Sequence, residues 1–421
     1  MSNLRVDKKI MSWALYDFAN SVFFTTVMAG FFPVFFKKYW SGEIAATVTT
    51  ERLGWVLSLS GFLLAVLSPT LGVISDKRRS KKKFLFITMI LGVIATCGLY
   101  FVGQGDWQPA AILYGFALFM CSASCVFYDS LLPSITTEDR YDFVSSLGYS
   151  LGYLGGGILF LLNVIMYLKP SLFGISSDIQ AVKISFLSVG LWWFIFTLPL
   201  MRNVPEPETE ISDRHIGHLT VDTLKELKGT IADIFKNKNL FYFVLAYWFY
   251  IDGVFTVMSM AVDFGMSLGL ESSDLIKALL ITQFVGFPAA YIFGLFASRW
   301  SNKNLILVCL GVYALAIIGA SQMKTETDFF ILACVIGLAQ GGVQALSRSL
   351  FAQLSPPEKS GEYFGFFNLL GKFASVLGPA LIAIFAQTTG DSRKTILSLL
   401  ILIAAGSLLL LKVKTKKRIS S

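Results

Sequence analysis

Residues 10–36 read IMSWALYDFANSVFFTTVMAGFFPVFF, an apolar stretch that carries Asp17 and Asn20 in its first half. A helix needs about 20 apolar residues to cross the hydrocarbon core of a bilayer, and this stretch is long enough. A carboxylate inside such a span is costly, so it usually faces a cavity or a partner. The stretch therefore predicts a membrane-spanning helix with a functional polar face.

The whole chain has the composition of an integral membrane protein. Of its 421 residues, 55% are hydrophobic and 15% are charged, whereas soluble domains carry about 25% charged residues. The mean hydropathy is +0.66, so we expect the lipid bilayer to be the main partner. The net charge of +8 does not indicate nucleic-acid binding, because the basic residues cluster in short segments between apolar runs, as membrane orientation requires.

The cysteines and histidines, which often mark reactive sites, do not indicate such a site here. The five cysteines lie inside apolar runs without metal-ligand spacing, which predicts small buried hydrophobic residues. His215 and His218 make a poor metal site by themselves, and the sequence has no nucleotide-binding or catalytic motif. We expect no metal, no cofactor and no enzymatic activity. The first apolar run lacks a small-residue cleavage site, so we expect it to be a retained span.

Twelve apolar runs predict an all-α integral membrane fold with twelve transmembrane helices in two six-helix bundles. The runs lie near 10–36, 53–75, 84–103, 109–133, 143–168, 181–200, 239–265, 275–298, 304–321, 328–352, 362–387 and 394–411. One long connection divides them six and six. The predicted domains are an N-terminal bundle at 1–200, a central loop at 201–238 and a C-terminal bundle at 239–421.

Both chain ends are predicted to be cytoplasmic. With that orientation the cytoplasmic segments hold 24 of the 35 Lys and Arg residues, and nine lie on the other side, which follows the positive-inside bias. We expect a multi-pass protein of the cell (inner) membrane. In the cytoplasmic central loop, Leu224, Leu227, Ile231 and Ile234 recur at helical spacing and predict an amphipathic helix on the membrane face.

The two predicted halves repeat one another. The matching pairs are WALYD (13–17) with WFYID (248–252), DSLL (129–132) with RSLF (348–351), GVISDK (72–77) with GLFASR (294–299), and Gly148 and Gly155 with Gly371 and Gly378. The pairs keep one order and nearly one offset along the chain. An internal duplication of this kind is typical of secondary transporters.

Twelve spans in two halves, with a long central loop and a basic loop after the second span, resemble the major facilitator superfamily. The loop GVISDKRRSKKKF (72–84) is similar to that superfamily's motif of a glycine, an aspartate four residues on, and a basic cluster. The resemblance implies that Gly72, Asp76, Lys77, Arg78 and Arg79 form a conformational switch that clamps the two halves together on the cytoplasmic side. Where the superfamily has a second glycine, this chain has Arg78, Arg79 and Ser80.

Three stretches resemble one branch of the superfamily more closely. They are WALYDFANSVFFTTVMAGFFPVFF (13–36), FYDSLLPSI (127–135) and NLLGKFASVLGPAL (368–381). The branch contains fungal vacuolar amino-acid effluxers linked to autophagy and related bacterial permeases. The resemblance implies the fold and a transport function, with an amino acid as one candidate substrate.

Polar residues inside the spans are the candidate site. In the superfamily, spans one, four, seven and ten line the central cavity, and most of the intramembrane charges of this chain fall on those spans. We expect substrate or proton binding by Asp17, Asn20, Asp252, Lys372, Thr256 and Gln344. Asp252, Thr256, Ser259 and Asp263 would form one polar stripe on a helix. Lys372 and Asp252 together offer both charges that a zwitterion needs.

Asp129 and Arg348 occupy equivalent positions in the two halves and carry opposite charges. Both lie roughly 6 Å from the cytoplasmic ends of their spans, at about 1.5 Å per residue. We expect them to meet there. They could bind substrate, or they could form an ion pair that closes a cytoplasmic gate.

The sequence as a whole predicts a secondary active transporter that moves a small polar organic solute by alternating access, coupled to protons, and we expect a monomer. A buried carboxylate can have a raised affinity for a proton, which makes such coupling chemically reasonable. Asp17 and Asp252 are the leading candidates. The alternatives are a multidrug or siderophore exporter, which the 38 phenylalanines leave open, and a sensor or scaffold that kept the fold but does not transport.

Overall fold

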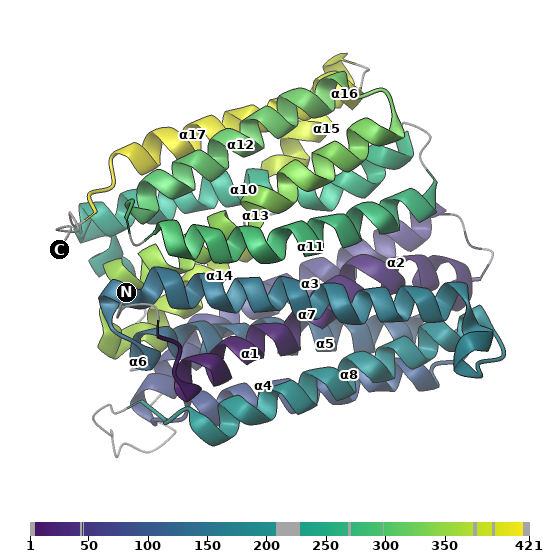
Figure 1. The fold of residues 1–421 in the computed structure, drawn as a ribbon, viewed down its shortest axis with the longest axis horizontal. Coiled ribbons are helices and arrows are strands. Elements are labelled where there is room, and N and C mark those ends of the chain that lie inside the picture. The colour runs from purple at the N-terminus through teal and green to yellow at the C-terminus, as the bar shows by residue number, and fades with distance from the viewer. Residues whose placement is uncertain are drawn as a thin grey trace.

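The computed structural model describes residues 5–42, 44, 46–207, 228–267, 271–297, 299–373, 377–389 and 392–415, and within them every regular element is helical (Figure 1). The α-helices are α1 Lys8–Val22, α2 Phe32–Phe35, α3 Ala46–Lys77, α4 Lys81–Gly98, α5 Trp107–Ser130, α6 Leu132–Ile135, α7 Tyr141–Leu168, α8 Asp178–Asn203, α10 Lys238–Ser267, α11 Ser272–Phe296, α12 Asn302–Gln322, α13 Glu326–Leu354, α14 Ser360–Phe373, α15 Leu377–Thr389, α16 Ser392–Thr395 and α17 Leu399–Leu411.

Ten helices of the described part are long and apolar enough to cross a membrane, and a shorter apolar helix covers Ile396–Leu411. The ten coincide with the first ten predicted runs. The predicted run 362–387 corresponds to two shorter helices, α14 and α15, with residues 374–376 between them outside the described part. A helical multi-span architecture is confirmed, and the count of twelve crossings stays a prediction.

Helices pack mainly with others from their own half of the chain. We call the helices up to α8 the N-half and those from α10 onward the C-half. In the N-half, α1 packs on α7 and α8, and α4 on α5; in the C-half, α10 packs on α17, and α13 on α11 and α12. The halves meet where α3 contacts α14 and where α7 contacts α11 and α13. In Figure 1 most of the N-half occupies the lower part of the view and most of the C-half the upper part.

One end of the molecule holds both the start of α1 and the end of α17 (left in Figure 1). Hydrogen bonds tie the chain together there: the Asn239 side chain donates to the Lys414 carbonyl at 2.8 Å, and the Lys303 Nζ donates to the Val413 carbonyl at 3.0 Å. In the N-half, Lys9 donates to the Ser134 carbonyl. We call this end the terminal end.

The first span begins as a capped α-helix and continues as a wider π-helix. The Asp7 side chain accepts from the Ile10 backbone N–H at 2.8 Å and caps α1. From Phe23 to Phe31 the backbone is a π-helix, and α2 follows with Pro33 near its start.

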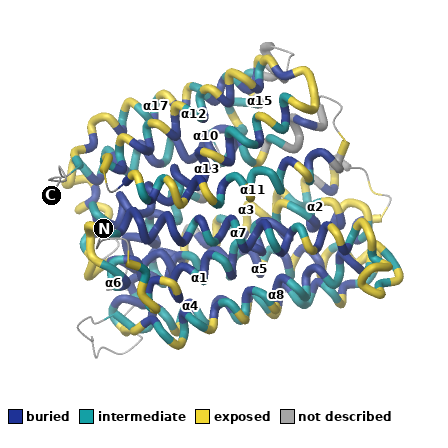
Figure 2. Tube along the Cα trace, viewed as in Figure 1, coloured by how far each residue is buried: buried dark blue, intermediate teal, exposed yellow. Residues whose placement is uncertain are grey.

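Buried residues run along the inner helices, among them α1, α7 and α13 (Figure 2). Large apolar residues also lie exposed on the outer surface, including Trp55, Phe101, Ile112, Leu191, Leu315 and Leu408. Exposed apolar surface on this scale is unfavourable in water and matches contact with lipid. The packing and the composition therefore agree on a membrane protein.

The central loop is described only from residue 228 onward, and 228–236 are helical. Of the residues predicted to form its apolar stripe, Ile234 is buried and Ile231 is 41% exposed, while Leu224 and Leu227 lie outside the described residues. The Thr230 hydroxyl, fully buried, donates to the Glu362 carboxylate at the start of α14. This helix thus contacts the C-half at the terminal end.

Candidate functional site

Arg348 joins the two halves through a buried ionic bridge. It projects from α13, is 1% exposed, and meets two carboxylates of the N-half. Its Nη2 lies 3.2 Å from the Oδ2 of Asp17 on α1, and its Nη1 lies 3.0 Å from the Oδ1 of Asp129 on α5. One guanidinium therefore serves two carboxylates, with a separate Nη atom of its planar fork directed at each.

The other polar atoms of the bridge also have partners. Arg348 Nε donates to the Ser145 hydroxyl at 2.8 Å, and Nη2 donates to the Ser145 carbonyl at 2.9 Å. The Tyr128 hydroxyl donates to Asp17 Oδ2 at 2.8 Å, and the Asn368 side chain donates to Asp129 Oδ2 at 3.2 Å. Buried charges are tolerated only when they are paired and hydrogen-bonded, and this network meets that requirement.

Aromatic rings surround the guanidinium. Its carbon lies 4.3 Å from the ring centre of Tyr149, 5.0 Å from that of Trp13 and 5.3 Å from that of Tyr128. The last two rings stack on each other with centres 4.4 Å apart. Cation–π attraction adds to the ion pairs when the cation is desolvated. We call Arg348, Asp17, Asp129 and these three aromatic residues the Arg348 cluster.

Glycines on α7 allow the cluster to form. A Cβ atom at Gly148 would lie 2.5 Å from Asp17 Oδ2, and one at Gly152 would lie 2.6 Å from the Ser21 hydroxyl. A Cβ at Gly155 would collide with the Phe18 carbonyl. The glycine run of this span is therefore a surface for close packing of α1 on α7, as small residues are in membrane helices.

The remaining predicted residues of the first and tenth spans lie near the bridge without joining it. Asn20, 2% exposed, donates from its amide to the Cys125 sulfur at 3.4 Å. Gln344 is half-buried on α13, one helical turn before Arg348. Asp17 was predicted as a separate site from Asp129 and Arg348, and the structure instead brings all three together.

Asp252 occupies a second polar site, away from the Arg348 cluster. Its carboxylate accepts from the backbone N–H groups of Leu377 at 2.9 Å and Gly378 at 2.8 Å, and from the Thr256 hydroxyl at 3.2 Å. A carboxylate is stabilised at the start of a helix by the free N–H groups there, and here it holds the start of α15. The predicted partner Lys372 has a side chain outside the described residues.

The predicted polar stripe on α10 is only partly described. Ser259 is exposed and Thr256 is buried, whereas Asp263 has a side chain outside the described residues. The structure thus connects Asp252 and Thr256 to each other and to α15. It leaves the outer part of the stripe as a prediction.

The loop after the second span clamps the halves together at the terminal end. Asp76 forms a salt bridge with Lys81 at 2.8 Å and accepts from the backbone N–H groups of Gly361 at 3.1 Å and Glu362 at 2.9 Å, the first turn of α14. Lys81 also donates to the Ser360 hydroxyl at 2.7 Å. We call these contacts the Asp76 clamp.

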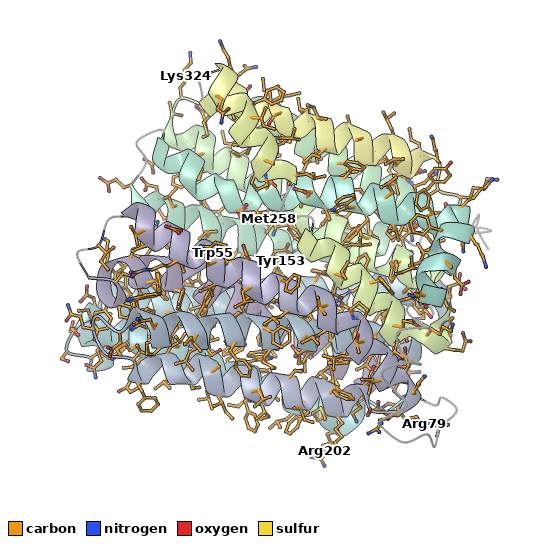
Figure 3. The ribbon with its side chains drawn as sticks, turned by 180° about the vertical axis from the view of Figure 1, so that it is seen from behind. Trp55, Arg79, Tyr153, Arg202, Met258 and Lys324 are labelled. Carbon is orange, nitrogen blue, oxygen red and sulfur yellow. The ribbon has the colours of Figure 1, made fainter. Side chains whose placement is uncertain are left out.

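Close backbone approach supports the Asp76 clamp, because a Cβ atom at Gly72 would collide with the Gly361 carbonyl. Lys77 and Arg78 follow Asp76 where α3 ends. Figure 3 shows Arg79 at the same end (right in that view). The structure therefore brings Gly72 and Asp76 to the interface between the halves, and the basic residues to its rim.

The turn after α3 keeps a left-handed conformation without a glycine. Arg79 has a φ of 47°, a backbone region that costs an ordinary residue about 1–2 kcal/mol. We expect the Arg79→Gly variant to unfold at a higher temperature than Arg79→Ala, by roughly 1 kcal/mol of stability. Both variants lack the arginine side chain, so the difference reports the backbone alone. Equal thermal stabilities of the two purified variants would show that the turn is unstrained.

Comparisons with known proteins agree with this fold. A family model described as "Vacuole effluxer Atg22 like" matches residues 53–420. An "uncharacterized MFS-type transporter YxiO" of Bacillus subtilis (strain 168) is 38% identical over 408 residues, which are 96% of this chain and 95% of that protein. Autophagy-related protein 22 of Saccharomyces cerevisiae (strain ATCC 204508 / S288c) is 25% identical over 431 residues, covering 93% of this chain and 76% of that protein.

Solved structures extend the comparison at the level of the fold alone. The human organic anion transporter MFSD10 (TETRAN) superimposes with a TM-score of 0.69 at 13% identity, over 96% of this chain and 99% of that one. The proton:xylose symporter XylE superimposes with a TM-score of 0.70 at 10% identity, over 97% and 95%. These proteins are membrane transporters and not enzymes. The chain therefore belongs to the family of vacuole effluxer Atg22-like proteins and has the fold of the major facilitator superfamily.

Proposed function

We propose that this protein is a secondary transporter that moves a small polar organic solute, in the first instance an amino acid, by alternating access. Two six-helix bundles, 1–200 and 239–421, would rock about a site near the membrane midplane. Twelve crossings would place both termini in the cytoplasm and the protein in the cell (inner) membrane, acting as a monomer. The observation that carries this proposal is the bridge from Arg348 to Asp17 and Asp129.

The bridge is suited to a contact between the halves that must form and break during transport. All its anionic groups come from the N-half and its cation comes from the C-half, so movement of the halves would break it as a unit. A buried ion pair contributes little net stability compared with apolar packing, whereas separating it without new partners is costly. Such a contact favours two discrete states, one bridged and one open with its charges hydrated or bound by a ligand.

The described conformer is closed at the terminal end. The Arg348 cluster and the Asp76 clamp both link the halves there. With the predicted orientation, that end faces the cytoplasm, and the conformer corresponds to an outward-facing state. We assign Asp129 and Arg348 to the gate, and Gly72, Asp76, Lys77, Arg78 and Arg79 to the loop that sets the conformational equilibrium.

Proton coupling would act through the Arg348 cluster. With both carboxylates ionised, the bridge has a formal charge of −1, and one added proton would neutralise it. Asp17 is the favoured proton acceptor, because its second partner is the Tyr128 hydroxyl, which can also accept a hydrogen bond from a protonated carboxyl, whereas the Asn368 NH2 group on Asp129 only donates. Asp252 is a weaker proton candidate because backbone N–H groups already stabilise its charged form.

The substrate site would lie on the cavity side of the Arg348 cluster. We assign contacts with substrate to Asn20, Gln344 and Thr256, together with Asp252 and Lys372. Asn20 and Gln344 lie one turn from Asp17 and Arg348 along their helices. A ligand bound there could exchange contacts with the bridge as the halves move.

Purified protein in proteoliposomes tests this function. A panel of labelled amino acids should include at least one whose flux rises when a pH gradient is imposed. Asp17→Asn should lower the gradient-driven flux at least tenfold, because the proton acceptor is lost. The matched control is Asp139→Asn at an exposed position, which should transport like the wild type. Absence of flux for every solute, or a flux indifferent to Asp17→Asn, would refute the proposal.

A further inference from the structure

A further buried carboxylate of the N-half accepts hydrogen bonds from three side chains of the C-half. Asp142, in the first turn of α7, is 1% exposed. Its Oδ1 accepts from the Gln353 amide at 3.2 Å and the Asn302 amide at 3.3 Å, and also from the Ser349 hydroxyl. Asn302 further donates to Gln353 at 3.1 Å. The carboxylate therefore links both α12 and α13 to α7.

This contact lies within one helical turn of the Arg348 cluster on both helices. On α7, Ser145 follows Asp142 by three residues, donates to the Ala345 carbonyl at 2.7 Å and accepts from Arg348. On α13, Ser349 directly follows Arg348. Neighbouring positions on the same two helices thus carry the Asp142 contact and the contact between Arg348 and Ser145, so the position of α13 against α7 affects both.

The Asp142 contact lies next to the segment of the C-half that corresponds, in the internal repeat, to the segment holding Asp76. In the second half the sequence GLFASR (294–299) has Ser298 where the first half has Asp76. Its glycine still packs against the other half, since a Cβ atom at Gly294 would lie 2.6 Å from Ser146 Cβ. A buried carboxylate is present at this interface, but α7 supplies it from the facing side.

We propose that Asp142 is a second latch that closes the terminal end and positions Arg348 in its bridge. The Asp76 clamp would be the first latch, and each latch would join the N-half to the C-half, on opposite sides of the Arg348 bridge. Loss of Asp142 leaves the Ser349, Asn302 and Gln353 donors without their shared acceptor, which weakens the closed state and shifts the population toward the open one. This inference rests on the proposed alternating-access function.

Cysteine accessibility measures the latch without a substrate. Ser146→Cys in a cysteine-free background is a suitable reporter, because Ser146 is fully buried against α11 and its hydroxyl has no partner among the described residues. Asp142→Ala should speed its labelling by a membrane-impermeant thiol reagent applied to the terminal end about tenfold. Ser349→Ala should act in the same direction. Asp139→Asn, exposed on the preceding turn, should leave the rate unchanged.

The double variant distinguishes the loss of one latch from a general weakening of the helix packing. Asp142→Ala with Ser349→Ala should label no faster than the faster single variant, because both remove one contact. A second reporter is Ser259→Cys on the exposed part of α10. With Asp142→Ala it should be labelled from the end opposite the terminal end no faster than when Asp142 is intact. Unchanged labelling of Ser146→Cys, multiplicative single effects, or faster labelling at both ends would each overturn the latch. A protein that labels as expected but moves no solute would overturn the transport function and leave the latch standing.

Discussion

Replacing Arg348 with glutamine is expected to cost roughly 3–5 kcal/mol in stability of the closed conformer, because it leaves two buried carboxylates without their cation. The side chain is 1% exposed and serves Asp17 and Asp129 together. Glutamine keeps part of the length and loses the charge. The purified variant should unfold at a markedly lower temperature and should show no gradient-driven flux.

Two further variants test the electrostatic cause. Adding Asp129→Asn to Arg348→Gln should recover part of the lost stability, because it removes one of the unpaired charges. Arg299→Gln, the same substitution at an exposed position, should have little effect. If Arg348→Gln were as stable as Arg299→Gln, or if the second substitution lowered stability further, the bridge would not be the main force at this contact.

The second large effect is expected at Gly148 on α7. A Cβ atom there would lie 2.5 Å from Asp17 Oδ2, 2.9 Å from the Tyr128 hydroxyl and 3.0 Å from Arg348 Nη2. Gly148→Ala should therefore force the bridge apart and cost about 1–3 kcal/mol, the usual range for overpacking. Thermal unfolding measures this loss, and the flux assay should show a matching fall in transport.

Gly311 on α12 provides the control, since a Cβ atom at that position would meet nothing within 4 Å. Gly311→Ala should be neutral or stabilising by up to about 1 kcal/mol, through helix propensity alone. Only Gly148→Ala is thus expected to lower the stability. A tolerated Gly148→Ala with normal transport would mean that α1 and α7 are not held this closely in the working protein.

Sequence reasoning reached the membrane class, the superfamily fold and the pairing of Asp129 with Arg348. The pairing could be predicted because the internal repeat places both residues at equivalent depths with opposite charges. That Asp17 shares the same arginine could not be predicted, because it depends on how far α1 is rotated toward α7. Tyr128 and Ser145 were missed for the same reason: residue types such as tyrosine and serine are common in spans, and only packing gives them a shared partner.

The role of Asp252 was harder to predict, because it depends on a helix start inside an expected span. The sequence contains a usable indication: Gly378 and Pro379 lie at the second and third residues of α15. Proline near a helix start is favoured since its missing N–H needs no partner there. A continuous apolar run concealed this start, so the sequence did not predict that the carboxylate accepts backbone N–H groups of α15. Binding of a solute by Asp252 stays a prediction.

Distances between spin labels on the two halves test the central claim most directly. Lys83 and Lys359 are exposed residues that flank the contact between Lys81 and Ser360 at the terminal end. Cysteines at these two positions, in a cysteine-free background, can be labelled and measured by double electron–electron resonance. We expect a dominant short distance in the otherwise wild-type protein and a shift to a distinct longer distance on adding Arg348→Gln. A single distance that Arg348→Gln leaves unchanged would contradict a gate controlled by the bridge.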